Sequence, residues 1–317
     1  MSHLHEQAAV RNLRCHASAI TRFLWGELVI ETVASIFVTT LLMRHTSHLM
    51  FVCLPFVAFV VLRVLAVLVI TVVLWCLRDR SAPSLSVTSR VMLIWHEALA
   101  LIRIYFLMLG EFRIASVQQP LSDKTSFIVV LLHGVYCNRG IWRPWLQRFA
   151  ARTGCVLLAP NLEPVMGGLE VQARHFARWL NDVIDARSHP RLIMVGFSMG
   201  GLIARTCIEG ELLTMPVGKL ICIGTPHDGS RVASYAPGEA GRDLRVNSIA
   251  LSKLKHVNSD ESVKTVNLYS RHDTFVVPCQ NAYLPGARNE SIDGIGHLSL
   301  LYSPDVQERV LHELLTS

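Results

Sequence analysis

The strongest chemical signal in the sequence is a serine between glycines. Ser198 lies in the run GFSMGG at 196–201, which follows the apolar residues Leu192–Val195 and precedes a helical pattern. A strand, a sharp turn and a helix in this order form a nucleophile elbow, in which a strained backbone exposes the serine hydroxyl. Side chains at Gly196 and Gly200 would collide with the neighbouring strand and helix. The pattern therefore predicts nucleophilic catalysis by Ser198.

A second glycine turn indicates where an oxyanion would bind. His133 and Gly134 follow the apolar run Phe127–Leu132 and lead into Val135. Acyl transfer needs two donors aimed at the developing oxyanion. The backbone N–H groups of Val135 and of Met199, the residue after the serine, are the predicted pair, and Gly134 permits close approach. Taken without the serine, the loop would be an ordinary turn with a structural histidine.

The acid and the base of a triad are predicted at Asp273 and His297. Asp273 follows an apolar run, and His297 follows a shorter one 24 residues later. The order serine, acid, histidine is the one found with nucleophile elbows. His272 is a rival for the base, but it adjoins the acid and cannot easily turn its ring onto Ser198. Asp293 is a rival acid that lies too close in sequence to His297 to orient its ring from behind.

These residues require a parallel sheet to bring them together. From residue 126 onward, apolar runs alternate with helix-like stretches, which is typical of a parallel sheet with crossover helices and predicts an α/β fold. Ligands bind such sheets beyond the carboxyl ends of the strands, where the candidate residues stand. The predicted strands are Phe127–Leu132, Cys155–Ala159, Leu192–Val195, Leu220–Ile223, Val263–Tyr269 and Arg288–Ile292.

Three further stretches resemble a known family. GTPHDGS at 224–230, the segment at 243–251 that begins DLR, and GHLSLL at 296–301 resemble the triacylglycerol-lipase branch of the α/β-hydrolase superfamily, over roughly residues 125–315. The chain is also similar to lipases that deacylate membrane-anchored lipids. The resemblance implies the α/β-hydrolase fold and a structural role for His227. It implies the same nucleophile, base, acid and oxyanion donors: Ser198, His297, Asp273, Val135 and Met199.

The sequence departs from these lipases at two points. Phe197 stands where the lipases often have histidine, which would alter the alcohol side of the pocket. The acidic clusters that bind calcium in some lipases are not recognisable, so neither a metal nor a cofactor is expected. The insertion 228–261 is long enough for a lid and is equally compatible with a fixed loop.

The composition divides the chain into two parts. Hydrophobic residues make up 51% and charged residues 17%, whereas soluble domains average about 25% charged. Residues 1–119 hold ten arginines, no lysine and six acidic residues, and the remainder holds 20 basic and 18 acidic residues. The arginines are scattered beside apolar runs, so nucleic-acid binding is not indicated. We expect a polar head at 1–22, a membrane region at 23–119 and a catalytic domain at 120–317.

The membrane region contains two runs long enough to cross a bilayer. These spans are predicted at 23–43 and 49–77. Glu27 or Glu31 is expected to pair with Arg63 across the hairpin, because charged groups at membrane depth are costly unless paired. A third run at 91–109 has a narrow polar stripe and could lie in the membrane interface, cross the membrane or pack under the catalytic domain.

Arginines flank both ends of the predicted hairpin. This places the two ends in the cytoplasm and, with them, the catalytic domain on the cytoplasmic side of a bacterial inner membrane. If the third run also crosses the membrane, the catalytic domain lies on the other side. The sequence thus predicts a membrane-anchored serine hydrolase of acyl esters, with a lipid or another acyl ester as substrate and the bilayer as partner. The alternatives are an acyltransferase with the same triad and an inactive lipid-binding module.

Overall fold

A six-stranded parallel sheet forms the centre of the molecule. The computed structural model describes residues 18–42, 48–77, 82–114, 127–184, 191–254 and 263–316. The strand order is β2-β1-β3-β4-β5-β6, and every neighbouring pair is parallel. All six predicted strands are confirmed to within a few residues: β1 Phe127–Leu132, β2 Val156–Leu158, β3 Arg191–Phe197, β4 Val217–Ile223, β5 Lys264–Tyr269 and β6 Arg288–Ser291.

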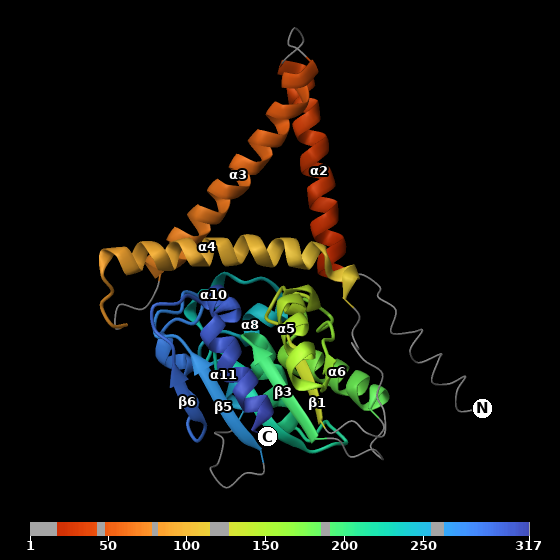
Figure 1. Ribbon diagram of the computed structural model, residues 1–317, viewed down its shortest axis with the longest axis vertical. Coiled ribbons are helices and arrows are strands. Elements are labelled where there is room, and N and C mark those ends of the chain that lie inside the picture. The colour runs from red at the N-terminus through yellow and green to blue at the C-terminus, as the bar shows by residue number, and fades with distance from the viewer. Residues whose placement is uncertain are drawn as a thin grey trace, which may run out of the picture.

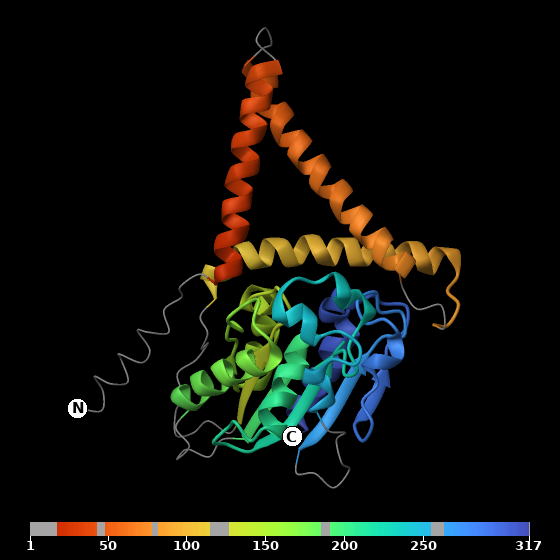
Figure 2. The same ribbon diagram turned by 180° about the vertical axis from the view of Figure 1, so that it is seen from behind.

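Helices cover both faces of the sheet (Figures 1 and 2). Successive residues of β1 point to opposite faces, so Val129 and Leu131 belong to one core, whereas Ile128 and Val130 belong to the other. The first core is shared with α5 Arg143–Thr153, α10 His297–Tyr302 and α11 Pro304–Leu315, and the second with α6 Leu169–Val183 and α7 Met199–Glu209.

The N-terminal part of the chain forms a helical hairpin outside the α/β part. Its helices are α2 Ala19–Leu42 and α3 His48–Leu77, which correspond to the two predicted apolar runs. They contact each other and then diverge toward separate points on α4 Val87–Leu109 (Figure 1). The side chain of Arg63 lies outside the described part of the structure, so its expected pairing with Glu27 or Glu31 remains a prediction.

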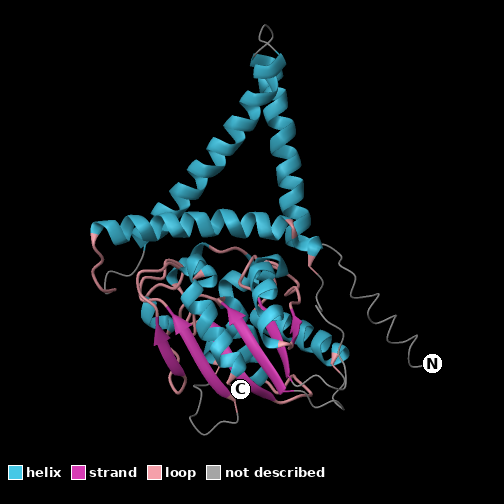
Figure 3. Ribbon diagram, viewed as in Figure 1, coloured by secondary structure: helices cyan, strands magenta, loops and turns pink. Residues whose placement is uncertain are grey.

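Helix α4 lies across the carboxyl end of the sheet, with the hairpin on its other side (Figure 3). Among the described residues it is the one helix long and apolar enough to cross a membrane, but a third of its most apolar window is buried in the protein. Ala100, Ile104 and Met108 belong to the same core as β1. One side of this helix thus packs on the α/β part, whereas Trp95 and Phe106 on it are exposed, so the interfacial alternative stays a prediction. The predicted boundary near residue 120 therefore leaves out a helix that shares the core of the catalytic part.

A buried carboxylate holds the start of α2 against this core. Glu111, in the short helix η1 Glu111–Arg113, accepts hydrogen bonds from the backbone and side chain of Ser18, from Thr21 and from Asn161. Arg139 lies 3.3 Å from the same carboxylate. Burial raises the pKa of Glu111, but the hydrogen bonds outweigh it and the net pKa is lowered. The hairpin is thus tied by polar contacts to the α/β part.

The insertion predicted as a lid packs against the α/β part over its described residues, up to Leu254. Asp243 accepts a hydrogen bond from the backbone N–H of Leu169 at 2.8 Å, and the backbone of Glu239 donates to Met166. These contacts favour the fixed-loop alternative. The remaining short helices are η2 Arg139–Trp142, η4 Arg231–Tyr235, α8 Gly238–Asp243, α9 Ile249–Ser252 and η5 Cys279–Ala282.

The packing of α4 predicts that the α/β part needs this helix in order to fold. A chain that begins at Ala82 keeps α4, whereas one that begins at Gln118 exposes the core surface under Ala100, Ile104 and Met108. Burying each such side chain contributes on the order of 1 to 3 kcal/mol. We expect the chain from Ala82 to unfold cooperatively in detergent-free buffer and the chain from Gln118 to aggregate or melt at a much lower temperature. Equal melting temperatures would show that α4 is dispensable.

Candidate active site

Ser198 occupies the turn between β3 and α7. Its backbone has φ 53° and ψ −123°, a conformation that is strained for a residue with a side chain. The backbone N–H of Ser198 donates to Ile223 at the end of β4, which fixes the turn at the carboxyl edge of the sheet. The residue is 7% exposed. This is the geometry of a nucleophile elbow.

The glycines of the elbow allow its close contacts. A Cβ atom at Gly196 would lie 2.4 Å from the backbone of Gly201 in α7, and one at Gly200 would lie 2.2 Å from the carbonyl oxygen of Leu132 at the end of β1. Neither contact is possible for a larger residue without moving a strand or a helix. The structure therefore shows the close contacts that were expected to exclude side chains at Gly196 and Gly200.

The structure brings Asp273 and His297 together. Asp273 follows β5 and His297 begins α10, and Nδ1 of His297 lies 2.7 Å from Oδ2 of Asp273. The other oxygen of Asp273 accepts the backbone N–H groups of Phe275 and Val276. Because a carboxylate accepts, Nδ1 of His297 carries the proton and Nε2 retains its lone pair. That is the tautomer required of a general base.

Aromatic rings enclose the imidazole of His297. The ring centroids of Phe197 and Phe275 each lie 5.1 Å from that of His297, so the phenylalanine that replaces the lipase histidine packs against the candidate base. A Cβ at Gly224, after β4, would lie 3.3 Å from the same imidazole. Burial lowers the pKa of His297, but the charge and hydrogen bond of Asp273 and the charge of Glu97 outweigh it, and the net pKa is raised.

The rival acid and base have other partners. His272 accepts a hydrogen bond from the N–H of Gly294 at Nδ1 and donates from Nε2 to the carbonyl oxygen of Pro83. Asp293 pairs with Arg271 at the surface. These bonds hold neither side chain against His297 or Ser198. The structure therefore favours Asp273 as the acid and His297 as the base.

His227 is a buried linker between elements. Arg205 donates to its Nδ1 at 3.3 Å, and its Nε2 donates to Asn267 at 3.2 Å. Burial and the charge of Arg205 lower the pKa of His227 to about 3. It is therefore neutral and joins α7 to β5, in keeping with the structural role that the resemblance implies.

The loop after β1 approaches the serine from the other side. Gly134 and Cys137 close a turn through a 3.2 Å hydrogen bond from the N–H of Cys137, which leaves the N–H of Val135 outside that bond. A Cβ at Gly134 would lie 3.2 Å from the Cβ of Ser198. Met199 is the first residue of α7, where helical N–H groups have no intrahelical acceptor. Gly134, which precedes the predicted donor Val135, and Met199, the other predicted donor, thus both adjoin Ser198.

His133 fixes the conformation of this loop. The N–H of Leu162 donates to its Nε2 at 2.9 Å, so Nδ1 carries the proton and donates to the carbonyl oxygen of Gly134, also at 2.9 Å. Burial lowers the pKa of His133 to about 4. His133 is therefore a neutral, structural part of the candidate oxyanion loop.

Glu97 is a residue of this site that the sequence did not indicate. It lies in the polar stripe of the third apolar run, and its carboxylate contacts the segments that carry Asp273 and His297. The one acidic residue of this helix was the available signal, and its partners lie 177 to 202 residues away along the chain.

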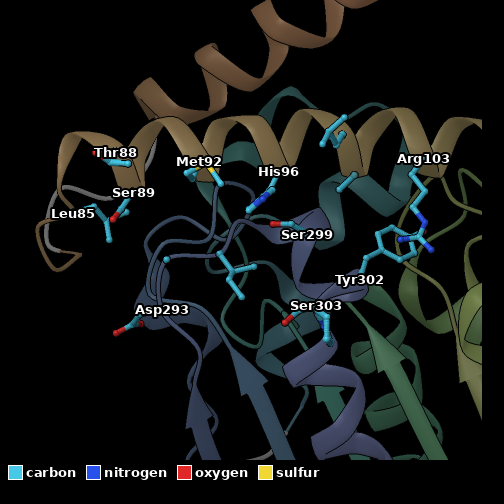
Figure 4. Close-up of a pocket in the computed structure, with 15 residues that line it drawn as sticks. Leu85, Thr88, Ser89, Met92, His96, Arg103, Asp293, Ser299, Tyr302 and Ser303 are labelled. Atoms are coloured by element: carbon cyan, nitrogen blue, oxygen red, sulfur yellow. The ribbon is translucent and has the colours of Figure 1, made fainter. Parts of the chain in front are cut away.

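A groove of about 750 Å³ runs beside the site, between α4 and α10 (Figure 4). Met92, Leu99 and Tyr302 provide much of its apolar lining, and the guanidinium of Arg103 lies 4.4 Å from the centre of the Tyr302 ring. Ser299 also lines the groove, but the candidate triad does not. The groove is a neighbour of the candidate active site.

Comparison with known proteins agrees with this architecture. Residues 129–254 match the profile of the Alpha/beta hydrolase family. The mature form of the Bacillus licheniformis lipase BlEst2 superposes with a TM-score of 0.50 at 19% identity, covering 63% of this chain and 96% of the lipase. The chain has the α/β-hydrolase fold. Aspergillus fumigatus lipase B has a TM-score of 0.52 at 17% identity, over 64% of this chain and 56% of that one.

The α/β-hydrolase profile covers only part of the site. It includes Ser198 and the oxyanion loop and ends before Asp273 and His297. A comparison with curated protein sequences gave no match. The candidate acid and base therefore rest on geometry alone.

The lowered pKa of the buried His133 predicts how the free energy of unfolding depends on pH. Between pH 6.5 and about 4 the unfolded chain binds a proton at this residue and the folded chain does not, so the free energy of unfolding falls as the pH falls, by on the order of 3 kcal/mol. His133→Gln keeps an acceptor for Leu162 but cannot titrate. Urea unfolding should show the stability difference between wild type and His133→Gln shrinking by that amount from pH 7 to pH 4. The exposed His312→Gln is the control, and parallel curves for His133→Gln would contradict the assignment.

Proposed function

We propose that this protein is a serine hydrolase of carboxylic esters, with Ser198 as nucleophile, His297 as general base and Asp273 as the acid that orients it. The observation that carries the proposal is the Asp273–His297 pair, 2.7 Å apart, at the same sheet edge as a serine with the backbone of a nucleophile elbow. This combination supports acyl transfer through a covalent intermediate.

The proposed reaction has two halves. Ser198 Oγ attacks the ester carbonyl carbon and gives its proton to Nε2 of His297, while the N–H groups of Val135 and Met199 stabilise the oxyanion. The imidazolium then protonates the departing alcohol. In the second half water gives a proton to the same nitrogen and attacks the acyl carbon. The imidazolium then returns this proton to Ser198 Oγ as the bond between Oγ and the acyl carbon breaks, which releases the acid and free Ser198. Asp273 stays ionised and stabilises the imidazolium in both halves.

We further infer that the substrate is a lipid ester and that α2 and α3 anchor the enzyme in a bilayer. The carboxyl edge of the sheet and the hairpin lie on opposite sides of α4 (Figure 3), so an inserted hairpin would turn the site toward the membrane. Trp95 and Phe106 on α4 are 54% and 66% exposed, which suits the water–lipid boundary. An anchor of this kind raises the effective concentration of substrate.

Substitution of the serine and the acid tests the proposed chemistry. Ser198→Ala removes the nucleophile without adding bulk, so labelling by a fluorophosphonate probe and hydrolysis of short esters should both be lost, while the exposed Ser252→Ala should keep both. Asp273→Asn favours the wrong imidazole tautomer and should lower kcat by roughly four orders of magnitude, and Asp293→Asn should leave it unchanged. Labelling that persists in Ser198→Ala would refute the assignment.

Reporter fusions test the proposed topology. Because α4 packs on the α/β part, the domain should lie on the same side as both ends of the hairpin, and the flanking arginines place that side in the cytoplasm. A reporter after Ser317 that works only in the cytoplasm should be active, and the same reporter between α2 and α3 should be inactive. The reverse pattern would move the hydrolase to the outer side.

A further inference from the structure

Glu97 places a buried carboxylate beside the candidate base. The residue is 1% exposed. Its Oε1 accepts the backbone N–H of Leu298 at 2.8 Å and the hydroxyl of Thr274 at 3.2 Å, and its Oε2 accepts the backbone N–H of Ser299 at 3.0 Å and its hydroxyl at 2.9 Å. The two backbone N–H groups can only donate, one to each carboxylate oxygen. Burial raises the pKa of Glu97, and these backbone bonds act against that effect.

These donors belong to the two segments that hold the candidate acid and base. Leu298 directly follows His297 at the start of α10, and Thr274 directly follows Asp273. The fit is tight, because a Cβ at Gly296 would lie 2.4 Å from Oε2 of Glu97. The side chain of Glu97, on α4, thus bonds to both segments and holds them in position relative to each other.

We propose that Glu97 is a positioning residue for the base: it holds the start of α10 and the segment after β5 so that the His297 imidazole stays aligned between Asp273 and Ser198. The inference rests on the proposed hydrolase function. It gives α4 a part in catalysis, since a helix from the N-terminal third of the chain determines the geometry of residues near its C-terminus. Misalignment of a catalytic group by about 1 Å costs on the order of a hundredfold in rate.

The charge of Glu97 also acts on His297. The charged groups that act on this imidazole are Asp273, from the segment after β5, and Glu97, from α4, and both favour the imidazolium. Removal of the negative charge should therefore lower the pKa of the base, and the acidic limb of the pH–rate profile should move to lower pH. A buried carboxylate far from His297 would not move this limb.

The test compares Glu97→Gln with a matched buried carboxylate, Glu313→Gln. Glu313 lies on α11, away from the candidate triad, and pairs with Lys219 and Arg288. With a short soluble ester and the full chain, Glu97→Gln should lower kcat by about tenfold and Glu97→Ala by about a hundredfold. KM should change little, and the acidic limb of Glu97→Gln should shift to lower pH. Glu313→Gln should lower the melting temperature and leave kcat and the acidic limb unchanged.

A second variant covers the possibility that substitution of Glu97 prevents folding. Thr274→Val has nearly the same shape and removes one hydrogen bond to Glu97. It should lower kcat by a few-fold while the protein still melts cooperatively. The proposal is overturned if Glu97→Gln folds with wild-type kcat and acidic limb, or if Glu97 cannot be replaced and Thr274→Val has wild-type kcat.

Fluorophosphonate labelling separates this inference from the proposed function. Wild-type protein that does not react with the probe would contradict the hydrolase assignment itself. Wild-type protein that reacts quickly, with Glu97→Gln reacting at the same rate and with the same pH dependence, would contradict only the positioning role of Glu97.

Discussion

The carboxylate of Glu97, buried at the carboxyl edge of the sheet, is the interaction on which the arrangement of the site depends. A buried charge without compensating donors is strongly unfavourable, and here backbone N–H groups and hydroxyls from the segments of the candidate acid and base supply them. Burial still raises the pKa of Glu97 in spite of these bonds. The carboxylate, the start of α10 and the segment after β5 therefore stabilise one another, so α4 belongs to the same structural unit as the candidate site.

A second buried carboxylate, just beyond the C-terminal end of α4, repeats this arrangement. Glu111 binds the start of α2 and reaches Asn161 and Arg139, next to the strand-end loops that hold His133. The two acids thus connect the hairpin and α4 to both halves of the candidate site. If the hairpin anchors the protein as proposed, this attachment restricts the orientation of the candidate site relative to a bilayer, whereas a flexible tether would only hold it nearby.

Neutral histidines organise the loops around the candidate base. His133 and His227 each have one ring nitrogen that accepts and one that donates, so protonation would break a buried hydrogen bond in each. His297 differs because Nδ1 faces the carboxylate of Asp273, which stabilises the charged form. The difference in partners, more than burial, separates the structural histidines from the candidate base.

The sequence by itself determined the strands, the elbow and the order of the candidate triad. The strands and the glycines around Ser198 can be recognised from short stretches of sequence. Burial of alternate residues requires apolar side chains in a strand, and close contact between backbones requires glycine. Only the tertiary structure decided the place of α4 and the role of Glu97. An apolar helix with a polar stripe satisfies a membrane, an interface or a protein core equally well. The choice depends on donors 201 residues away, whose positions exist only once the sheet has assembled.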